Sequence, residues 1–346
     1  MQPRRKKSFL RSLLKTVIII AIISCYANFL HPVLFFSKPP LTNVDSSVLQ
    51  RGIPVAFTSN GYQLKGRLLA PPRPSFKIPA IIFRPGSGAT SSYASSGYPG
   101  LLKAMLEEQL PMDSMAVLYI DKRGVGASEG QWYNTTFEES AADMKAAAYY
   151  LSSLPYIDPH KIIIAGHSEG GWIVEVCLSR YPETFAGGLS LAGPTLDVKE
   201  QIIHEFAGTA ICVDKKPREA ALRKARIFVN VATVMSELFP FTQQWRQLAV
   251  THGFKAAPYI QSIKKPVLFM FGENDRTVWA DDCLRELQQI FPGGYPAHID
   301  TVVLKGTNHR IRTAPACYRG SKVYPFSDEA RLRINQWIRK VAFSQL

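Results

Sequence analysis

Residues 162–171 read Ile-Ile-Ile-Ala-Gly-His-Ser-Glu-Gly-Gly, so that a serine stands between two glycines at the end of an apolar, β-branched run. A stretch with helix-compatible periodicity, residues 172–176, follows directly. In a G-x-S-x-G pattern at a strand-to-helix turn, the glycines let strand and helix pass closely, and the serine side chain is exposed at the tip. Ser168 is therefore the predicted nucleophile. The backbone N–H of Glu169, at the start of the helix, is a predicted donor to a developing oxyanion.

The pattern G-x-S-x-G alone arises by chance about 0.1 times in a chain of this length. A serine nucleophile also needs a histidine base and an acid, so the interpretation depends on whether these partners are present. Hydrolases with this turn carry nucleophile, acid and histidine in that order along the chain. Five of the seven histidines precede any plausible acid: His31, His160, His167, His204 and His252. Of the other two, His309 follows a predicted strand at 299–304, whereas His298 lies at the opposite end of that strand. His309 is therefore the predicted base, and His167 is predicted to be structural.

The acid is expected after the apolar run at 266–271, which ends in Gly-Glu-Asn-Asp. A carboxylate just past the carboxyl end of a strand lies on the edge where α/β sheets carry their sites. Asp275 is the predicted acid, and Glu273 is the alternative, with a surface position as its ordinary role. In this chemistry Ser168 carries the acyl group, while His309 moves the proton. The acid fixes the imidazole tautomer and stabilises the imidazolium.

A second oxyanion donor is predicted after the early strand at 78–83, where Arg-Pro-Gly-Ser-Gly follows. A glycine-bracketed turn in this place is where such folds present a backbone N–H to the nucleophile. We expect the N–H of Ser87 to be this donor, with Gly88 as the alternative. An ordinary flexible turn is the non-functional interpretation.

Four motifs resemble the α/β-hydrolase superfamily, close to its serine-aminopeptidase-like and prolyl-oligopeptidase-like esterases and peptidases. The motifs are Pro85-Gly86-Ser87-Gly88, the stretch Asp121-Lys122-Arg123-Gly124-Val125-Gly126-Ala127-Ser128, Gly166-His167-Ser168-Glu169-Gly170, and Gly272-Glu273-Asn274-Asp275 with His309. The resemblance covers about residues 52–344 and implies that the loop at 121–128 supports the site structurally. The chain departs from many relatives at Pro85, where they carry a histidine.

Strand and helix patterns alternate along the chain and predict an α/β fold, with a mostly parallel sheet and helices on both faces. The predicted strands are 78–84, 115–120, 161–166, 186–192, 266–271 and 299–304; the predicted helices are 99–109, 136–153, 170–180, 280–290 and 327–343. Two alternating runs around Asn60-Gly61, 54–58 and 63–69, predict a β-hairpin.

Roughly 70 residues separate the strands near 191 and 266, more than a direct crossover needs. Residues 195–260 are therefore predicted to form a helical cap over Ser168. Its candidate pocket-lining residues are Leu238, Phe239, Phe241 and Trp245, although packing within the cap is the more ordinary role for each.

The N-terminus has a different composition. Residues 1–15 hold six Lys and Arg and no acid, and residues 16–36 are mostly apolar. A basic head before an apolar segment is typical of a signal anchor or signal peptide, with the basic end kept in the cytoplasm. At about 1.5 Å per residue, 16–36 can just span a hydrocarbon core of about 30 Å. We expect an uncleaved anchor, a tether at 37–52 and a hydrolase domain at 53–346.

Two alternatives involve cleavage: a simple signal peptide, or a bacterial lipoprotein in which Cys25 is lipidated. All three interpretations place the hydrolase domain outside the cytoplasm. A purely cytoplasmic protein is the remaining alternative.

The formal net charge is +14, and +8 without the six cations of residues 1–15. The cap holds a further group of cations: Lys215, Lys216, Arg218, Arg223, Lys224 and Arg226. We interpret these as a solvated helix face, with attraction to anionic lipid headgroups or acidic substrates as the alternative. No motif indicates nucleic-acid binding. No spacing indicates a metal site and no glycine loop a phosphate site, so we expect neither metal nor cofactor.

Five cysteines are too few for a disulfide-dense scaffold. Cys177, on the helix after the nucleophile, is expected to face the core. Cys283 and Cys317 follow the acid and histidine loops, which must meet, so outside the cytoplasm they are predicted to form a disulfide bond.

Together these patterns predict a membrane-tethered serine hydrolase that cleaves carboxylic esters through an acyl-enzyme. An aminopeptidase-like or dipeptidyl-peptidase-like enzyme on the same triad is the first alternative. An exopeptidase needs carboxylates to capture the substrate's amine, and the candidates considered in the cap, which also holds many cations, are Glu200, Glu205 and Asp214. A non-catalytic binding protein with this fold is the second alternative. The expected substrate is a small ester or a short peptide, and the oligomeric state is left open.

Overall fold

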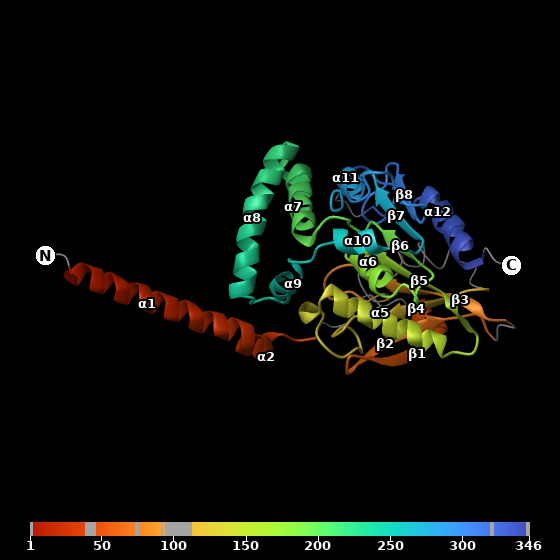
Figure 1. Ribbon diagram of the computed structural model, residues 1–346, viewed down its shortest axis with the longest axis horizontal. Coiled ribbons are helices and arrows are strands. Elements are labelled where there is room, and N and C mark those ends of the chain that lie inside the picture. Colours follow the sequence, from red (N-terminus) through yellow and green to blue (C-terminus); the bar gives the residue numbers. More distant parts are fainter. Residues whose placement is uncertain are drawn as a thin grey trace.

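The computed structural model describes residues 3–38, 46–72, 76–91, 93, 113–318 and 322–343. In this part of the chain a sheet of eight strands forms the centre, in the order β1-β2-β4-β3-β5-β6-β7-β8 (Figure 1). The strands are β1 (Ile53–Ser59), β2 (Tyr62–Leu69), β3 (Ile78–Arg84), β4 (Ala116–Ile120), β5 (Ile157–His167), β6 (Gly187–Leu191), β7 (Val267–Gly272) and β8 (Ile299–Leu304). β1 and β2 pair antiparallel, as do β2 and β4, and every pair from β4 to β8 is parallel. The predicted fold class is confirmed.

The predicted hairpin is formed by β1 and β2, whose last pair is Ser59 and Tyr62. Asn60 and Gly61 between them have φ angles of 48° and 83°. Positive φ at both central residues is the geometry of a type I′ turn, whose twist matches that of the two strands. The central strands behave differently, because every residue of β3 and β4 is buried. Strands covered on both faces are expected in a sheet built from crossover connections.

Helices cover both faces of the sheet. On one face pack α5 (Phe137–Ser152), α6 (Gly170–Arg180) and α11 (Ala280–Ile290), and on the other α12 (Asp328–Ile338) with the short α3 (Ser46–Arg51). Helix α5 begins at a capping box, in which Thr136 and Glu139 satisfy each other's backbone N–H. The predicted helix at 99–109 lies outside the described residues. Val48 of α3 is buried, so the end of the predicted tether packs against the domain.

Between β6 and β7 the chain forms four helices, α7 (Val198–Asp214), α8 (Arg218–Leu238), α9 (Gln243–Thr251) and α10 (Ala257–Ser262). Figure 1 shows α7 and α8 side by side, standing away from the sheet. They share a small apolar core of their own, formed by Ile203, Ala207, Ala221, Ala225 and Val229 with Trp279.

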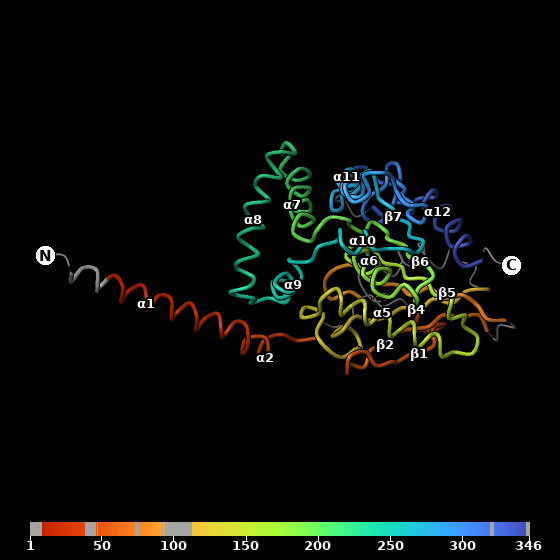
Figure 2. Tube along the Cα trace, in the orientation of Figure 1, coloured from red at the N-terminus to blue at the C-terminus, as the bar shows by residue number. Residues whose placement is uncertain are grey.

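At the N-terminus, α1 (Pro3–Cys25), a π-helical turn (Tyr26–Leu30) and α2 (His31–Phe35) follow one another without a break. Figures 1 and 2 show α1 extending away from the rest of the molecule. This N-terminal helix, over Phe9–Phe35, is long and apolar enough to cross a membrane.

The disulfide prediction is wrong in one partner. Cys317 is bonded to Cys212 at the end of α7, while Cys283 is a free thiol buried on α11. The cause is the direction of α11, which turns Cys283 into the core under the sheet, whereas the loop after His309 runs to the cap. Cys177 is buried in the core on α6, as predicted.

Candidate active site

The turn after β5 holds Ser168 in a left-handed conformation, with φ of 55°. Its amide donates to the carbonyl of Leu191, and its own carbonyl accepts from the amide of Gly171. The flanking glycines are required by close backbone approach: a Cβ at Gly166 would lie 2.1 Å from the carbonyl oxygen of Gly170. Backbone strain at this position presents the serine side chain at the tip of the turn.

Three side chains from three strand ends form one hydrogen-bonded chain. Ser168 follows β5, Asp275 follows β7 and His309 follows β8, and the parallel strands bring these ends to one edge. The Oγ of Ser168 lies 3.0 Å from Nε2 of His309. On the other side of the ring, Nδ1 of His309 lies 2.8 Å from Oδ2 of Asp275. The predicted nucleophile, base and acid are therefore in hydrogen-bond contact, in the arrangement that a serine-histidine-acid triad requires.

The carboxylate of Asp275 is oriented by its own loop. Its Oδ1 accepts from the amides of Thr277 and Val278, at 2.8 and 2.9 Å, which leaves Oδ2 for the histidine. The two alternative candidates, Glu273 for the acid and His298 for the base, make other contacts. Glu273 is exposed and accepts from the amide of Gly306, and His298 contacts the carbonyl of Ile263.

Two opposing effects act on the pKa of His309. Burial lowers it, but the charge and hydrogen bond of Asp275, helped by Glu205, outweigh burial, so the pKa lies above its ordinary value of 6.5. A raised pKa makes the imidazole a better proton acceptor during attack by the serine.

His167, set aside as structural, contributes directly to the position of the base. Its Nε2 donates to the backbone carbonyl of His309 at 2.8 Å, a carbonyl being able only to accept. Burial, with the nearby His309, lowers the pKa of His167 to about 3. The ring is therefore neutral at physiological pH and holds the loop of His309 without adding charge.

Lys122 connects the predicted oxyanion turn to the nucleophile turn. Its Nζ donates to the carbonyls of Gly86 and Gly88, and lies 3.4 Å from Oε1 of Glu169. Burial lowers the pKa of Lys122 to about 7, an effect that the carboxylate of Glu169 opposes. By holding these carbonyls on one side, the lysine fixes the orientation of the peptide planes around Ser87.

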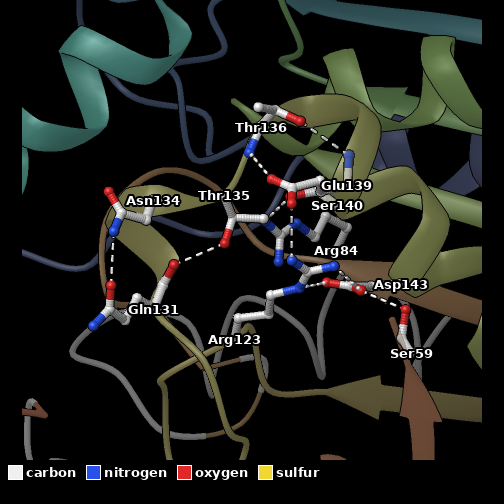
Figure 3. A network of polar contacts seen from close by, with 10 residues as sticks. All are labelled: Ser59, Arg84, Arg123, Gln131, Asn134, Thr135, Thr136, Glu139, Ser140 and Asp143. Atoms are coloured by element: carbon white, nitrogen blue, oxygen red, sulfur yellow. Dashed lines mark hydrogen bonds and ion pairs between the residues drawn. The ribbon is translucent and has the colours of Figure 1, made fainter. Parts of the chain in front are cut away.

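Arg123, from the same motif at 121–128, forms a buried network that supports the site. Arg123 makes two hydrogen bonds of 2.8 Å with the carboxylate of Asp143 on α5, and Ser59 donates to the same carboxylate. Figure 3 shows this network, with the Arg123 side chain lying against Asp143 and Arg84 reaching Ser140. Paired, hydrogen-bonded charges of this kind are expected where charged groups are buried.

A cavity of about 450 Å³ opens in front of Ser168, between the sheet edge and the cap. Ser87 and Glu169 line it, as the predicted oxyanion donors should, whereas Gly88 is not among its described lining residues. The opposite wall is largely apolar and comes from α7, α8 and α9. Of the four predicted pocket-lining residues, Trp245 lines the cavity; Leu238, Phe239 and Phe241 are not among the described residues that do.

The family of the chain follows from comparison with known proteins. The profile of a protein family described as serine aminopeptidase, S33, matches residues 102–313. The chain belongs to this family. It is accordingly an α/β hydrolase, as the motifs of the sheet edge indicated.

Solved structures similar to this serine aminopeptidase family member share its fold. An esterase from Pyrococcus furiosus, Pf2001, has a TM-score of 0.59 at 19% identity, covering 88% of this chain and 98% of its own. Est1E from Butyrivibrio proteoclasticus, solved with ferulic acid, has a TM-score of 0.52 at 17% identity, with 83% and 98% covered. The acylaminoacyl peptidase of Pyrococcus horikoshii has a TM-score of 0.55 at 18% identity, covering 91% of this chain but 44% of its own.

Two residues of the site in this family member escaped prediction. Lys122 lies inside the motif at 121–128, and a lysine two residues past the end of a buried strand was the available signal. Gln247 of α9 donates to Oε2 of Glu169 at 2.7 Å, which ties the cap to the nucleophile turn. No pattern in the cap sequence marks Gln247, because its role depends on how α9 lies over the sheet.

Proposed function

We propose that the protein cleaves carboxylic esters through an acyl-enzyme, with Ser168 as nucleophile, His309 as base and Asp275 as the orienting acid. The observation that carries this proposal is the continuous hydrogen-bonded chain from Asp275 to the serine hydroxyl, at the mouth of a largely apolar cavity. Such a cavity suits an acyl chain better than a charged peptide.

In the proposed reaction, Nε2 of His309 takes the proton of Ser168 as the Oγ attacks the ester carbonyl. The amides of Ser87 and Glu169 then stabilise the negative charge on the carbonyl oxygen. The imidazolium returns its proton to the departing alcohol. Water, activated by the same histidine, releases the acid and restores the serine.

One observation favours a second candidate, an aminopeptidase on the same triad. Glu205 of α7 lines the cavity, and a carboxylate there could pair with the amine of a peptide substrate. Although Glu205 keeps access to solvent, partial desolvation raises its pKa, which disfavours its charged form. The other carboxylate among the described lining residues, Glu169, is already engaged by Lys122 and Gln247. The ester is therefore the preferred substrate class.

We place the catalytic domain outside the cytoplasm, anchored by the N-terminal helix. The basic residues before Phe9 favour retention of that end in the cytoplasm. The Cys212–Cys317 disulfide supports an oxidising compartment for the rest of the chain.

A fluorophosphonate probe tests the nucleophile. We expect covalent labelling of the full-length protein and none of Ser168→Ala, whose esterase rate should fall by at least about 10⁴-fold. Labelling that survives in Ser168→Ala, or a wild type that is neither labelled nor active, would contradict the proposal.

Matched substrates separate the two candidates. We expect turnover of p-nitrophenyl esters and little of aminoacyl p-nitroanilides, and we expect Glu205→Gln to leave ester turnover within about threefold. Preferential cleavage of anilides, lost in Glu205→Gln, would favour the aminopeptidase instead. Glu200→Gln is a matched control, because Glu200 is only partly buried, is paired with Arg226 and is not among the described residues that line the cavity.

A further inference from the structure

Helix α8 carries an exposed apolar stripe. Ile227, Val231, Val234 and Leu238 follow at intervals of four, three and four residues, which places them on one face. Their side chains are 63%, 58%, 54% and 38% exposed. The opposite face packs against α7 and contains the buried residues Ala221, Ala225, Val229 and Thr233. Since a surface helix normally buries its apolar stripe, this one is the reverse of the expected pattern and indicates a partner.

The carboxyl end of α8 is attached to the N-terminal helix. Nδ2 of Asn28 donates to the carbonyls of Glu237 and Leu238, at 3.3 and 3.4 Å. Arg246 of α9 in turn donates to Oδ1 of Asn28 at 2.7 Å. The rings of Tyr26 and His31 lie against Phe241, just beyond α8. The end of the exposed stripe is therefore fixed beside a helix that is apolar enough to cross a membrane.

The position of Asn28 along the N-terminal helix indicates how deep α8 lies relative to a membrane that this helix crosses. Asn28 stands seven residues before the end of α2 at Phe35, or about 10 Å along the axis. Amphipathic helices that lie in a membrane interface bury their apolar face by about 5–10 Å. Figure 1 shows α1 leaving the molecule on the side that carries α8, so one membrane surface can meet both.

We propose that the exposed face of α8 lies in the interface of the bilayer that holds the N-terminal helix, and that the substrate is a long-chain acyl ester entering from that bilayer. The second half of this inference rests on the proposed ester hydrolysis; the first half does not.

Two phenylalanines connect this face to the active site. Phe206 of α7 and Phe228 of α8 have ring centroids 4.8 Å apart and are 45% and 52% exposed. Both line the cavity of Ser168, and both line a neighbouring groove of about 430 Å³ between α7 and α8. Because the two rings border both spaces, they form a continuous apolar surface along which an acyl chain can pass from the bilayer to the nucleophile.

The charges on α8 suit lipid headgroups. Arg223 and Lys224 lie at the amino end of the stripe, and neither has an ion-pair partner among the described residues. Cations of an interfacial helix are attracted to anionic headgroups, while the apolar residues enter the acyl region. Arg218 and Arg226, by contrast, are paired with Asp282 and Glu200.

The substrate part is tested with one leaving group and two acyl chains. The full-length protein in phosphatidylcholine vesicles is given 4-methylumbelliferyl oleate, which partitions into the bilayer, or the water-soluble acetate. Val231→Asp/Val234→Asp changes the stripe without touching the cavity lining. We expect oleate turnover to fall by about tenfold or more, with acetate turnover within about twofold.

The matched control is Leu332→Asp, an exposed apolar residue of α12, which should change neither rate. Oleate turnover that survives the double substitution overturns this part of the inference. Loss of both rates, together with loss of fluorophosphonate labelling, would mean that the variant is misfolded; Val231→Ser/Val234→Ser then repeats the test, and unchanged oleate turnover there overturns it.

The bilayer contact is tested without any activity. In a Cys25→Ser background, Val234→Cys is labelled with an environment-sensitive nitrobenzoxadiazole dye, and Leu332→Cys serves as control. The remaining thiols are buried, and burial raises the pKa of Cys283 to about 12, so they react slowly. We expect brominated lipids to quench the dye at 234 and not at 332. Absence of quenching at 234 overturns the contact, and an apolar emission without quenching would assign the face to a protein partner.

A failure of the proposed ester hydrolysis can be distinguished from a failure of this inference. In that case neither ester is cleaved and the probe does not label Ser168, yet lipid quenching at 234 remains. A failure of the inference leaves acetate turnover and labelling intact.

Discussion

The sheet edge and the cap are built in opposite ways. At the sheet edge each reacting group is held by several buried contacts: Asp275 by two amides, His309 by Asp275 and by His167. The outer part of the cap is held by few, and its longest helix exposes an apolar stripe to the surroundings. Catalysis requires reacting atoms that are fixed to within fractions of an ångström, whereas substrate entry requires a surface that can contact a membrane or another molecule.

A disulfide and several polar contacts join the two regions. The disulfide attaches α7 to the loop after His309, Gln201 donates to the carbonyl of Thr277, and Gln247 donates to Glu169. Close backbone contact adds to these, since a Cβ at Gly208 would lie 1.9 Å from the carbonyl oxygen of Arg276. If the sheet edge and the cap divide these roles, substitutions at the sheet edge should reduce the rate of the chemical step. Substitutions where the cap contacts the edge should affect stability or substrate binding.

Among the variants that keep the serine nucleophile, the largest effect is expected from Asp275→Asn. The amide cannot stabilise the imidazolium and favours the wrong tautomer, so kcat should fall by about 10³–10⁴-fold. The wild-type rate should fall as the pH drops through the raised pKa of His309, because only the neutral ring accepts the proton. Without the carboxylate, burial and Arg310 lower the pKa of His309 and only the weaker effect of Glu205 opposes them, so the residual acid limb should move to lower pH.

The measurement is a pH–rate profile with a soluble ester. Glu273→Gln, two residues away and exposed, is the control and should behave as the wild type. An acid limb that does not move in Asp275→Asn would mean that another group controls the base.

The next effect concerns stability. Cys212→Ser/Cys317→Ser removes a bond that closes a loop of 105 residues. The free energy of unfolding should fall by about 2–4 kcal/mol, because the unfolded chain regains its freedom. Thermal unfolding in detergent measures this change, with Cys25→Ser as the control. Reductant should lower the wild-type Tm in the same direction, and a Tm that is insensitive to both would show that the cap is held without the disulfide.

A smaller effect on catalysis is expected from Lys122→Met. The carbonyls of Gly86 and Gly88 lose the lysine as a donor and keep Thr90, so the oxyanion turn shifts and kcat should fall by about 10–100-fold with little change in KM. Because the substitution also removes the cationic partner of Glu169, Lys122→Met/Glu169→Gln is measured beside it. Lys65→Met, which loses only an exposed contact with Gln63, is the control. A change in KM alone would assign Lys122 to binding.

The smallest effect is expected from Gln247→Leu. Loss of the contact between α9 and Glu169 should loosen the cap and raise KM for a soluble ester by about threefold, with kcat nearly unchanged. Gln243→Leu on the same helix, whose partner is the carbonyl of Ser37, is the comparison. Equal losses of kcat in both variants would contradict a division of labour between edge and cap.

Much of the sheet edge could be predicted from local patterns. Apolar β-branched runs, a glycine-flanked serine and polar residues just past strand ends each report a local conformation, and parallel strands then gather those ends. The pairing of Cys317 could not be predicted in this way, because it depends on the direction in which α11 and α7 present their side chains. The same holds for Gln247 and for His167, whose contacts span 78 and 142 residues along the chain.

By itself, the sequence determined the fold class, the three residues of the proposed triad and the apolar N-terminal segment, since each depends on periodicity or on residues adjacent in the chain. Only the tertiary structure decided the disulfide partner of Cys317, the hydrogen bonds from Lys122 to the oxyanion turn and the outward direction of the apolar stripe on α8. These features depend on how separate elements are oriented and packed, and side-chain direction relative to a distant element is not encoded in any local spacing.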